Sequence, residues 1–240
     1  MSEYPSEQEK AIIQAAEKIM LDTMARYDPS HDAYHVQRVR KTALALANAV
    51  PNTPDLLTIE LAALLHDVLD KKYVKPEQAA DPYAYFLPFF ESMAKDHGID
   101  LISDGRARNI ARIVENVSWT TEKKLRQKGL WIQWHEECIE LHCVQDADRL
   151  DAIGAFGIMR CAAYSSITNH ALHTPPHDPK EPESAIQHFH EKLIHIRDRL
   201  KTEPGRILGA RRHKVLLDFL ASVDEEFEVA SALTSTKIGP

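Results

Sequence analysis

The pair His66-Asp67 closes an apolar run, Leu-Ala-Ala-Leu-Leu at 61–65. An imidazole and a carboxylate at the buried end of a core helix would cost several kcal/mol if they were left unpaired. A divalent cation would offset that cost, because histidine and aspartate side chains are both common metal ligands. The pair therefore predicts a metal site.

Two further segments carry side chains suited to the same cation. His35 lies on the apolar stripe of a predicted helix, which turns its ring toward the interior. Between 144 and 151, acidic residues alternate with apolar ones in a stretch that should be buried. Asp146 and Asp148 are about 200° apart on a helix, so only one of them can face the cation. Periodicity alone does not choose between them.

The elements that must position these residues are helical. Apolar residues recur at three- and four-residue steps almost throughout, and no alternating strand pattern or internal repeat is visible. We therefore expect an all-α fold and a single domain over 1–240, whose only candidate boundary is a proline-rich surface loop at 168–183. The predicted helical stripes run over 12–24, 36–47, 57–68, 110–117, 138–159, 189–196 and 215–223. An aromatic-rich segment at 81–90 is expected to be a packed connection between helices.

Composition excludes several classes of function. A formal net charge of -7 argues against binding to nucleic-acid polymers or to anionic membranes, which both require clustered cations. No apolar run approaches the roughly 18 residues of a membrane span, and the N-terminus has no signal-like apolar region. Three cysteines without Cys-x-x-Cys spacing indicate reduced core thiols. We expect a cytoplasmic protein with a small-molecule substrate.

Three motifs, in this order, resemble the HD superfamily of metal-dependent phosphohydrolases. They are Ser-His-Asp-Ala-Tyr-His-Val at 30–36, His-Asp at 66–67 and Gln-Asp-Ala-Asp-Arg-Leu-Asp at 145–151. A bare His-Asp dipeptide is weak evidence, whereas three motifs on suitable helices are specific. With His-Phe-His-Glu-Lys-Leu at 188–193, the chain is similar to a small bacterial-type subgroup, and the resemblance covers about 6–228.

The resemblance implies a set of metal ligands. They are His35, His66, Asp67 and, from an Ala-Asp-Arg-Leu-like string, Asp148, with Asp146 as the alternative fourth ligand. Mixed imidazole and carboxylate ligands suit transition metals better than calcium, which prefers oxygen alone. Manganese is the first expectation by resemblance, and magnesium, cobalt, nickel, iron and zinc are the alternatives.

A catalytic role is expected for Asp67, Asp70 and Arg38. Asp70 lies four residues after His66, on the same helical face, where an acidic residue orients the attacking water in several HD relatives. The competing interpretation makes Asp70 a surface carboxylate that pairs with a neighbouring lysine.

Cations are needed where negative charge develops on a phosphoryl group. We expect Arg38, one turn beyond His35, to contact the substrate, together with Lys71, Lys72 and Arg149. These are the cations nearest to the ligands in the sequence.

Nucleotides are the leading substrate class implied by the resemblance, with release of pyrophosphate or phosphate from nucleoside triphosphates as the specific expectation. Two other functions remain open. A dinuclear-iron oxygenase on the same scaffold would use additional histidines, for which His97, His135 and His142 are the candidates. A non-catalytic nucleotide-sensing module would bind without turnover.

Overall fold

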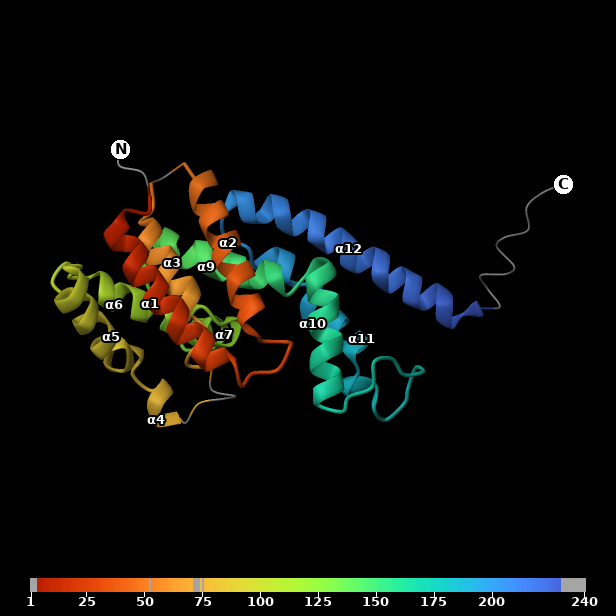
Figure 1. The fold of residues 1–240 in the computed structure, drawn as a ribbon. Coiled ribbons are helices and arrows are strands. Elements are labelled where there is room, and N and C mark those ends of the chain that lie inside the picture. Colours follow the sequence, from red (N-terminus) through yellow and green to blue (C-terminus); the bar gives the residue numbers. More distant parts are fainter. Residues whose placement is uncertain (1–3, 52, 71–73, 75, 230–240) are drawn as a thin grey trace.

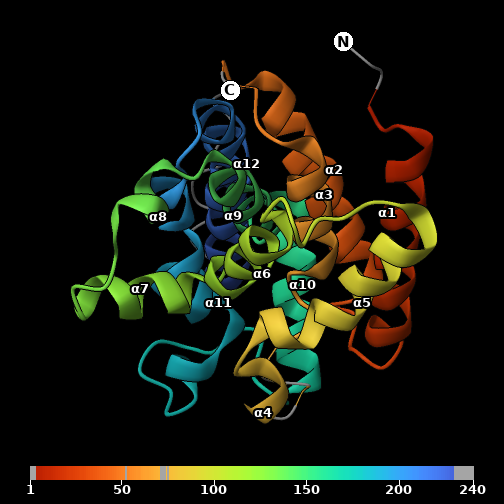
Figure 2. The same ribbon diagram turned by 90° about the vertical axis from the view of Figure 1, so that its left-hand side faces the viewer.

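The computed structural model describes residues 4–51, 53–70, 74 and 76–229. These residues form helices and connecting turns without any strand, which confirms the all-α prediction. Figures 1 and 2 show the arrangement in two views. The helices are α1 (Glu7–Met24), α2 (Ala33–Ala49), α3 (Leu56–Leu65), α4 (Pro76–Ala79), α5 (Pro82–His97), α6 (Arg106–Asn116), α7 (Trp119–Gln127), α8 (Gln133–Glu137), α9 (Ile139–Asp151), α10 (Gly154–Ile167), η1 (Glu181–Glu183), α11 (Ala185–His188), η2 (Phe189–Leu193), η3 (Ile196–Arg199) and α12 (Glu203–Phe227).

Helix α3 lies at the centre of the core. Every residue from Leu57 to Leu65 is buried, because α1, α2, α6 and α9 pack around it. The Asp55 carboxylate caps its start by accepting hydrogen bonds from the first backbone N–H groups. The one acidic side chain of the helix, Glu60, is neutralised by the guanidinium of Arg40 on α2. The helix ends at Leu65, which places His66 at the edge of the core.

Helices α2 and α9 pack against each other and against α3. The Asp32 side chain caps α2 at the backbone N–H of His35, so the candidate ligand stands in the first turn of the helix. The apolar stripe of α2 faces the core, as the sequence predicts. The three segments that carry the predicted ligands therefore lie side by side (Figure 1).

Two predicted elements differ from the structure. The stripe expected over 138–159 is divided, because α9 ends at Asp151 and Gly154, the first residue of α10, adopts a left-handed φ of 74°. Only glycine enters that region without steric strain. The aromatic-rich segment at 81–90 belongs to helix α5 rather than to a connection, and Pro82 stands in the first turn, where proline is tolerated.

The segment predicted as a loop at 168–183 contains no regular helix before the short turn η1. Its ends are held by two backbone hydrogen bonds, from Ala185 N to Ala171 O and from Ile186 N to Leu172 O. Among the described residues, no helix is both long enough and apolar enough to cross a lipid bilayer.

The three cysteines are buried and unpaired, which agrees with the prediction of core thiols. Burial raises the thiol pKa to about 11 for Cys138 and Cys161 and to about 12 for Cys143. All three are therefore protonated and unreactive near neutral pH.

Candidate metal centre

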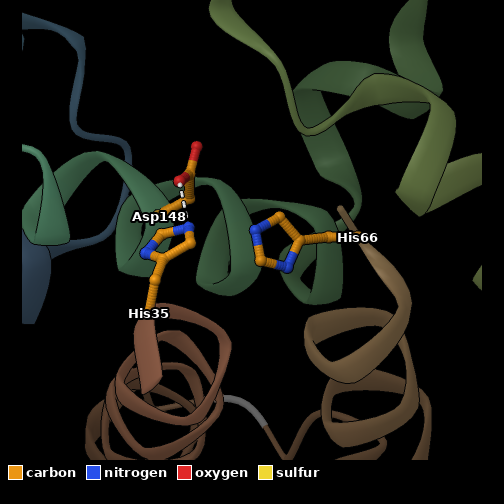
Figure 3. Close-up of side chains that lie close together, drawn as sticks. All are labelled: His35, His66 and Asp148. Atoms are coloured by element: carbon orange, nitrogen blue, oxygen red, sulfur yellow. Dashed lines mark ion pairs between the residues drawn. The ribbon is translucent and has the colours of Figure 1, made fainter. Parts of the chain in front are cut away.

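Three predicted ligands converge from α2, the end of α3, and α9. One ligand atom from each of His35, His66 and Asp148 lies within 4.8 Å of the others, and Figure 3 shows the two rings beside the carboxylate. The Nε2 atoms of both histidines are buried and have no hydrogen-bond partner among the described residues. Two buried nitrogens without partners are unfavourable, whereas a cation between them would accept both lone pairs. The donor set fits a divalent metal ion.

Asp67 completes this cluster. Its Oδ2 atom lies 3.4 Å from Nε2 of His35 and 3.4 Å from Nε2 of His66. Burial alone would raise the pKa of the Asp67 carboxyl, but the two imidazoles outweigh it and hold that pKa well below its usual range. The carboxylate is therefore ionised, as a metal ligand must be.

Asp146 lies on the other side of α9. Its carboxylate accepts hydrogen bonds from the backbone N–H of Lys201 at 2.9 Å, from the backbone N–H of Thr202 at 2.7 Å and from the Thr202 hydroxyl at 2.8 Å. Thr202 is the N-cap of α12, so Asp146 fastens α9 to the start of that helix. Of the two candidates for the fourth ligand, the structure places only Asp148 beside the histidines.

A second carboxylate orients His35 from behind. Oδ2 of Asp151 lies 2.7 Å from Nδ1 of His35, which directs Nε2 of the same ring into the cluster. Burial would raise the pKa of the Asp151 carboxyl, but His35 and Arg38 lower it well below its usual range. His66 is oriented in the same manner by the carbonyl of Ala63, 2.7 Å from its Nδ1. Such partners fix the tautomer and direction of a ligating imidazole.

Sequence reasoning missed the role of Asp151. A signal was present, since Asp151 follows Asp148 by three residues and therefore lies on the same face of α9. The identity of its partner could not be read in that way, because His35 is 116 positions away in the chain.

The carboxylate of Asp151 is held by two arginines. Arg38 donates two hydrogen bonds to it, at 2.7 and 2.9 Å, and Arg160 donates one at 3.2 Å. The guanidinium of Arg38 also stacks over Phe156, 4.3 Å from the ring centroid, and Arg38 does not line the cavity described below. Arg38 thus supports Asp151, and of the two arginines that hold this carboxylate only Arg160 lines the cavity. The substrate contact of Arg38 stays a prediction.

The other predicted substrate contacts have different placements. Asp70 lines the cavity close to His66 and Asp67. Arg149 also lines it, but its guanidinium is committed to Glu122 and to a backbone carbonyl. Lys71 and Lys72 lie outside the described residues.

Replacement of Asp151 by asparagine is expected to weaken metal binding about 10- to 100-fold, the usual effect of losing the partner of a ligating histidine. The asparagine amide fills the same volume as the carboxylate, but it is neutral and fixes the proton on Nδ1 of His35 less strongly. Equilibrium dialysis against manganese measures the change. Asp178→Asn, in the turn before η1, serves as the control. Equal metal affinity in wild type and Asp151→Asn would show that Asp151 has no orienting role.

A cavity of about 1060 Å³ opens beside the cluster. His66, Asp67, Asp70 and Asp148 lie in its wall, together with apolar side chains of α6 and α7. Residues of α7 line this cavity, and α7 and α1 lie on opposite sides of the molecule in the view of Figure 2. Cationic side chains are numerous around it, namely Lys124, Lys128, Arg149, Arg160, Lys192 and Arg199.

Helix α7 is attached to α9 through a buried ion-pair network. Glu122 of α7 lies 2.6 Å from Nη2 of Arg149 and 3.0 Å from Nζ of Lys201. Burial would raise the pKa of the Glu122 carboxyl, but Arg149 and Lys201 outweigh it and lower that pKa to about 2. A buried carboxylate therefore neutralises part of the positive charge at this wall.

This network predicts a pH-dependent contribution to stability. Because the folded-state pKa of Glu122 is depressed, its contribution is complete above the unfolded-state pKa of 4.5 and is lost as the pH falls toward about 2. Glu122→Gln is expected to lower the free energy of unfolding by about 3 kcal/mol at pH 7, since two buried cations lose their partner. Urea denaturation should show a smaller difference from wild type at pH 3. The exposed Glu91→Gln is the control, and a difference that stays constant between the two pH values would contradict the assignment.

The HD domain family matches residues 32–153, which contain all four clustered side chains. The chain is 30% identical to the Bacillus subtilis protein YpgQ over 205 residues, covering 85% of this chain and 88% of that protein. A crystal structure of YpgQ in complex with ADP superposes with a TM-score of 0.65 at 24% identity, over 91% of this chain and 96% of that one.

Other solved structures agree with this match. Lin1889 of Listeria innocua is 28% identical, with a TM-score of 0.67 over 92% of this chain and 98% of that chain. An HD-superfamily hydrolase of Bacillus thuringiensis is 25% identical, with a TM-score of 0.66 over 91% of this chain and 98% of that chain. With the family match spanning half of the sequence and the same helical fold in these relatives, the chain belongs to the HD domain family.

Proposed function

We propose that this protein is a divalent-metal-dependent phosphohydrolase that cleaves phosphate esters or anhydrides, with nucleotides as its leading substrate class. The observation that carries the proposal is the pair of buried, unpartnered Nε2 atoms of His35 and His66, next to two carboxylates at the edge of a cation-rich cavity. Membership of a family that includes hydrolases supports the reaction class.

The residues divide into ligands and groups that act on the substrate. His35, His66, Asp67 and Asp148 would hold the ion, which supplies a Lewis acid and lowers the pKa of water. Asp70, in the cavity wall beside the ligands, orients the attacking water and takes its proton. Arg160 lines the same cavity. Its Nε donates to the Ser30 carbonyl and its Nη1 to Asp151, so its Nη2 group is the part that stabilises negative charge developing on the phosphoryl oxygens.

The choice of nucleotides rests on two supports. A cavity of about 1060 Å³ is much larger than a single phosphate group requires, and it is at the upper end of ordinary ligand sites. The relative YpgQ has been crystallised in complex with ADP. Manganese is the proposed metal by resemblance, with magnesium, cobalt, nickel, iron and zinc as alternatives to be tested.

The positions of the three candidate histidines disfavour the oxygenase alternative, which requires ligands for a second metal. His135 is buried against Trp131 and approaches the Asn116 side chain, and His142 approaches the carbonyl of His135. His97 lies in the exposed last turn of α5. In the part of the chain that the structure describes, none of these three joins the cluster of His35, His66 and Asp148.

The decisive experiment uses full-length protein freed of metal with a chelator and then loaded separately with manganese, magnesium, cobalt or nickel. Nucleoside mono-, di- and triphosphates and simple phosphate monoesters are assayed, with phosphate and pyrophosphate measured separately. We expect metal-dependent release from nucleotides. Nucleotide binding without release in every metal would favour the sensing module, and two bound irons with oxygen consumption would favour the oxygenase.

A further inference from the structure

The guanidinium of Arg199 lies in the wall of the cavity without a carboxylate partner. It stacks over the indole of Trp119, with its Cζ atom 4.2 Å from the ring centroid, and both residues line the cavity. Among the described residues, no Asp or Glu oxygen lies within 4.0 Å of its nitrogens. Stacking uses the face of a guanidinium and leaves its N–H edge available for acceptors.

The surroundings of Arg199 are positively charged. Arg149 donates a hydrogen bond to the backbone carbonyl of Arg199, and its guanidinium lies 5.6 Å from the Trp119 ring. The nearest buried carboxylate, Glu122, is already shared by Arg149, Lys201 and Arg126. Burial and the charge of Arg149 lower the pKa of Arg199, and they outweigh the opposite effects of Asp198 and Glu122.

The same wall offers further hydrogen-bond donors. Thr120 and Thr121, in the first turn of α7, line the cavity beside Trp119. Their hydroxyl groups and the positive end of the helix dipole add to the field of Arg199. An anion at this wall would meet a planar guanidinium and neutral donors, and the buried carboxylate of Glu122 nearby is already paired.

We propose that Arg199, stacked on Trp119, forms a second anion subsite, which binds a phosphoryl group other than the one attacked at the metal centre. The inference rests on the proposed function and deepens it. A substrate that fills both places carries at least two linked phosphoryl groups, as phosphoanhydrides do. Arg149 and Glu122 fix the wall on which the subsite is built.

Pyrophosphate binding to metal-free protein tests the subsite without relying on catalysis. Isothermal titration calorimetry is carried out in EDTA at low salt, with wild type, Arg199→Gln, Arg199→Lys and Arg197→Ala. Arg197 is the matched control, because it lies on the same short helix, is exposed and does not line the cavity. We expect Arg199→Gln to weaken pyrophosphate binding about 10- to 100-fold, the range for loss of a charge-assisted hydrogen bond.

Arg199→Lys should recover part of the affinity, since it restores the charge but not the planar fork. Arg197→Ala should bind like wild type. Equal affinity in wild type and Arg199→Gln, or no binding of pyrophosphate to wild type, would overturn the proposal. Far-UV circular dichroism of each variant establishes that the helices are intact.

Hydrolysis assays separate this proposal from the function on which it rests. If wild type binds pyrophosphate through Arg199 but hydrolyses no phosphorylated compound with any metal, the subsite stands and the proposed function fails. If wild type is active, Arg199→Gln should raise KM for nucleoside triphosphates far more than KM for monoesters. An equal change for both substrate classes would refute the subsite while leaving the hydrolase assignment in place.

Discussion

Replacement of His66 by alanine is expected to abolish stoichiometric metal binding and to reduce phosphate release by more than about 100-fold. Loss of a residue that only orients a ligand costs up to about 100-fold, and loss of the ligand itself should cost more. His66 contributes one of two buried Nε2 atoms that have no other acceptor or donor. Its removal leaves too few ligands around the ion, and the carboxylate of Asp67 loses one of the imidazoles beside it. Metal content by atomic emission and product release by a colorimetric assay measure the two effects.

The helical fold should survive this change. His66 stands after the last residue of α3, and the helix itself is packed through its own buried residues from Leu57 to Leu65. Asp67→Ala is expected to behave in the same way, and His195→Ala, at an exposed position far along the chain, is the matched control. Full activity of His66→Ala with a normal circular dichroism spectrum would contradict the hypothesis that one metal site containing His66 carries the activity.

Asp148→Asn and Asp146→Asn are expected to have opposite effects, although the residues are two positions apart. Asp148→Asn should lose the metal ion while the free energy of unfolding changes little, because its carboxylate is partly exposed beside the histidines. Asp146→Asn should retain the metal ion but lower the free energy of unfolding by about 2 to 4 kcal/mol, because an amide N–H would face the donors of Lys201 and Thr202.

Helix α12 approaches the Asp146 carboxylate closely, since a Cβ at Gly205 would come within 2.4 Å of it. Metal content and urea denaturation of the Asp148→Asn and Asp146→Asn preparations measure the contrast. Metal loss in Asp146→Asn, with retention in Asp148→Asn, would reverse the assignment.

The sequence was sufficient to place a site residue where the apolar pattern of its own helix determines whether its side chain is buried. His66 and Asp67 could be placed because they end a run that is apolar on every side, which only a central helix such as α3 satisfies. His35 could be oriented because its helix has one apolar stripe. The all-α architecture follows from the same periodicity.

Contacts across the fold could not be predicted in this way. Both faces of α9 are buried, so periodicity did not distinguish Asp146 from Asp148. The difference between them is a tertiary contact, because Asp146 accepts a hydrogen bond from Thr202, the N-cap of α12. Proximity in sequence suggested that Arg38 contacts the substrate, but the carboxylate of Asp151, 113 positions away, engages its guanidinium. Tertiary partners of this kind leave no periodic signal.

The buried thiols make the chain suitable for site-specific labelling. Because Cys138, Cys143 and Cys161 are buried and protonated near neutral pH, maleimide reagents should modify them far more slowly than an exposed cysteine in the folded protein. A cysteine introduced at the exposed Gln127, at the end of α7, would then be the one reactive site. A fluorophore attached there would report on the environment of α7 in an otherwise wild-type chain, without prior removal of the native cysteines.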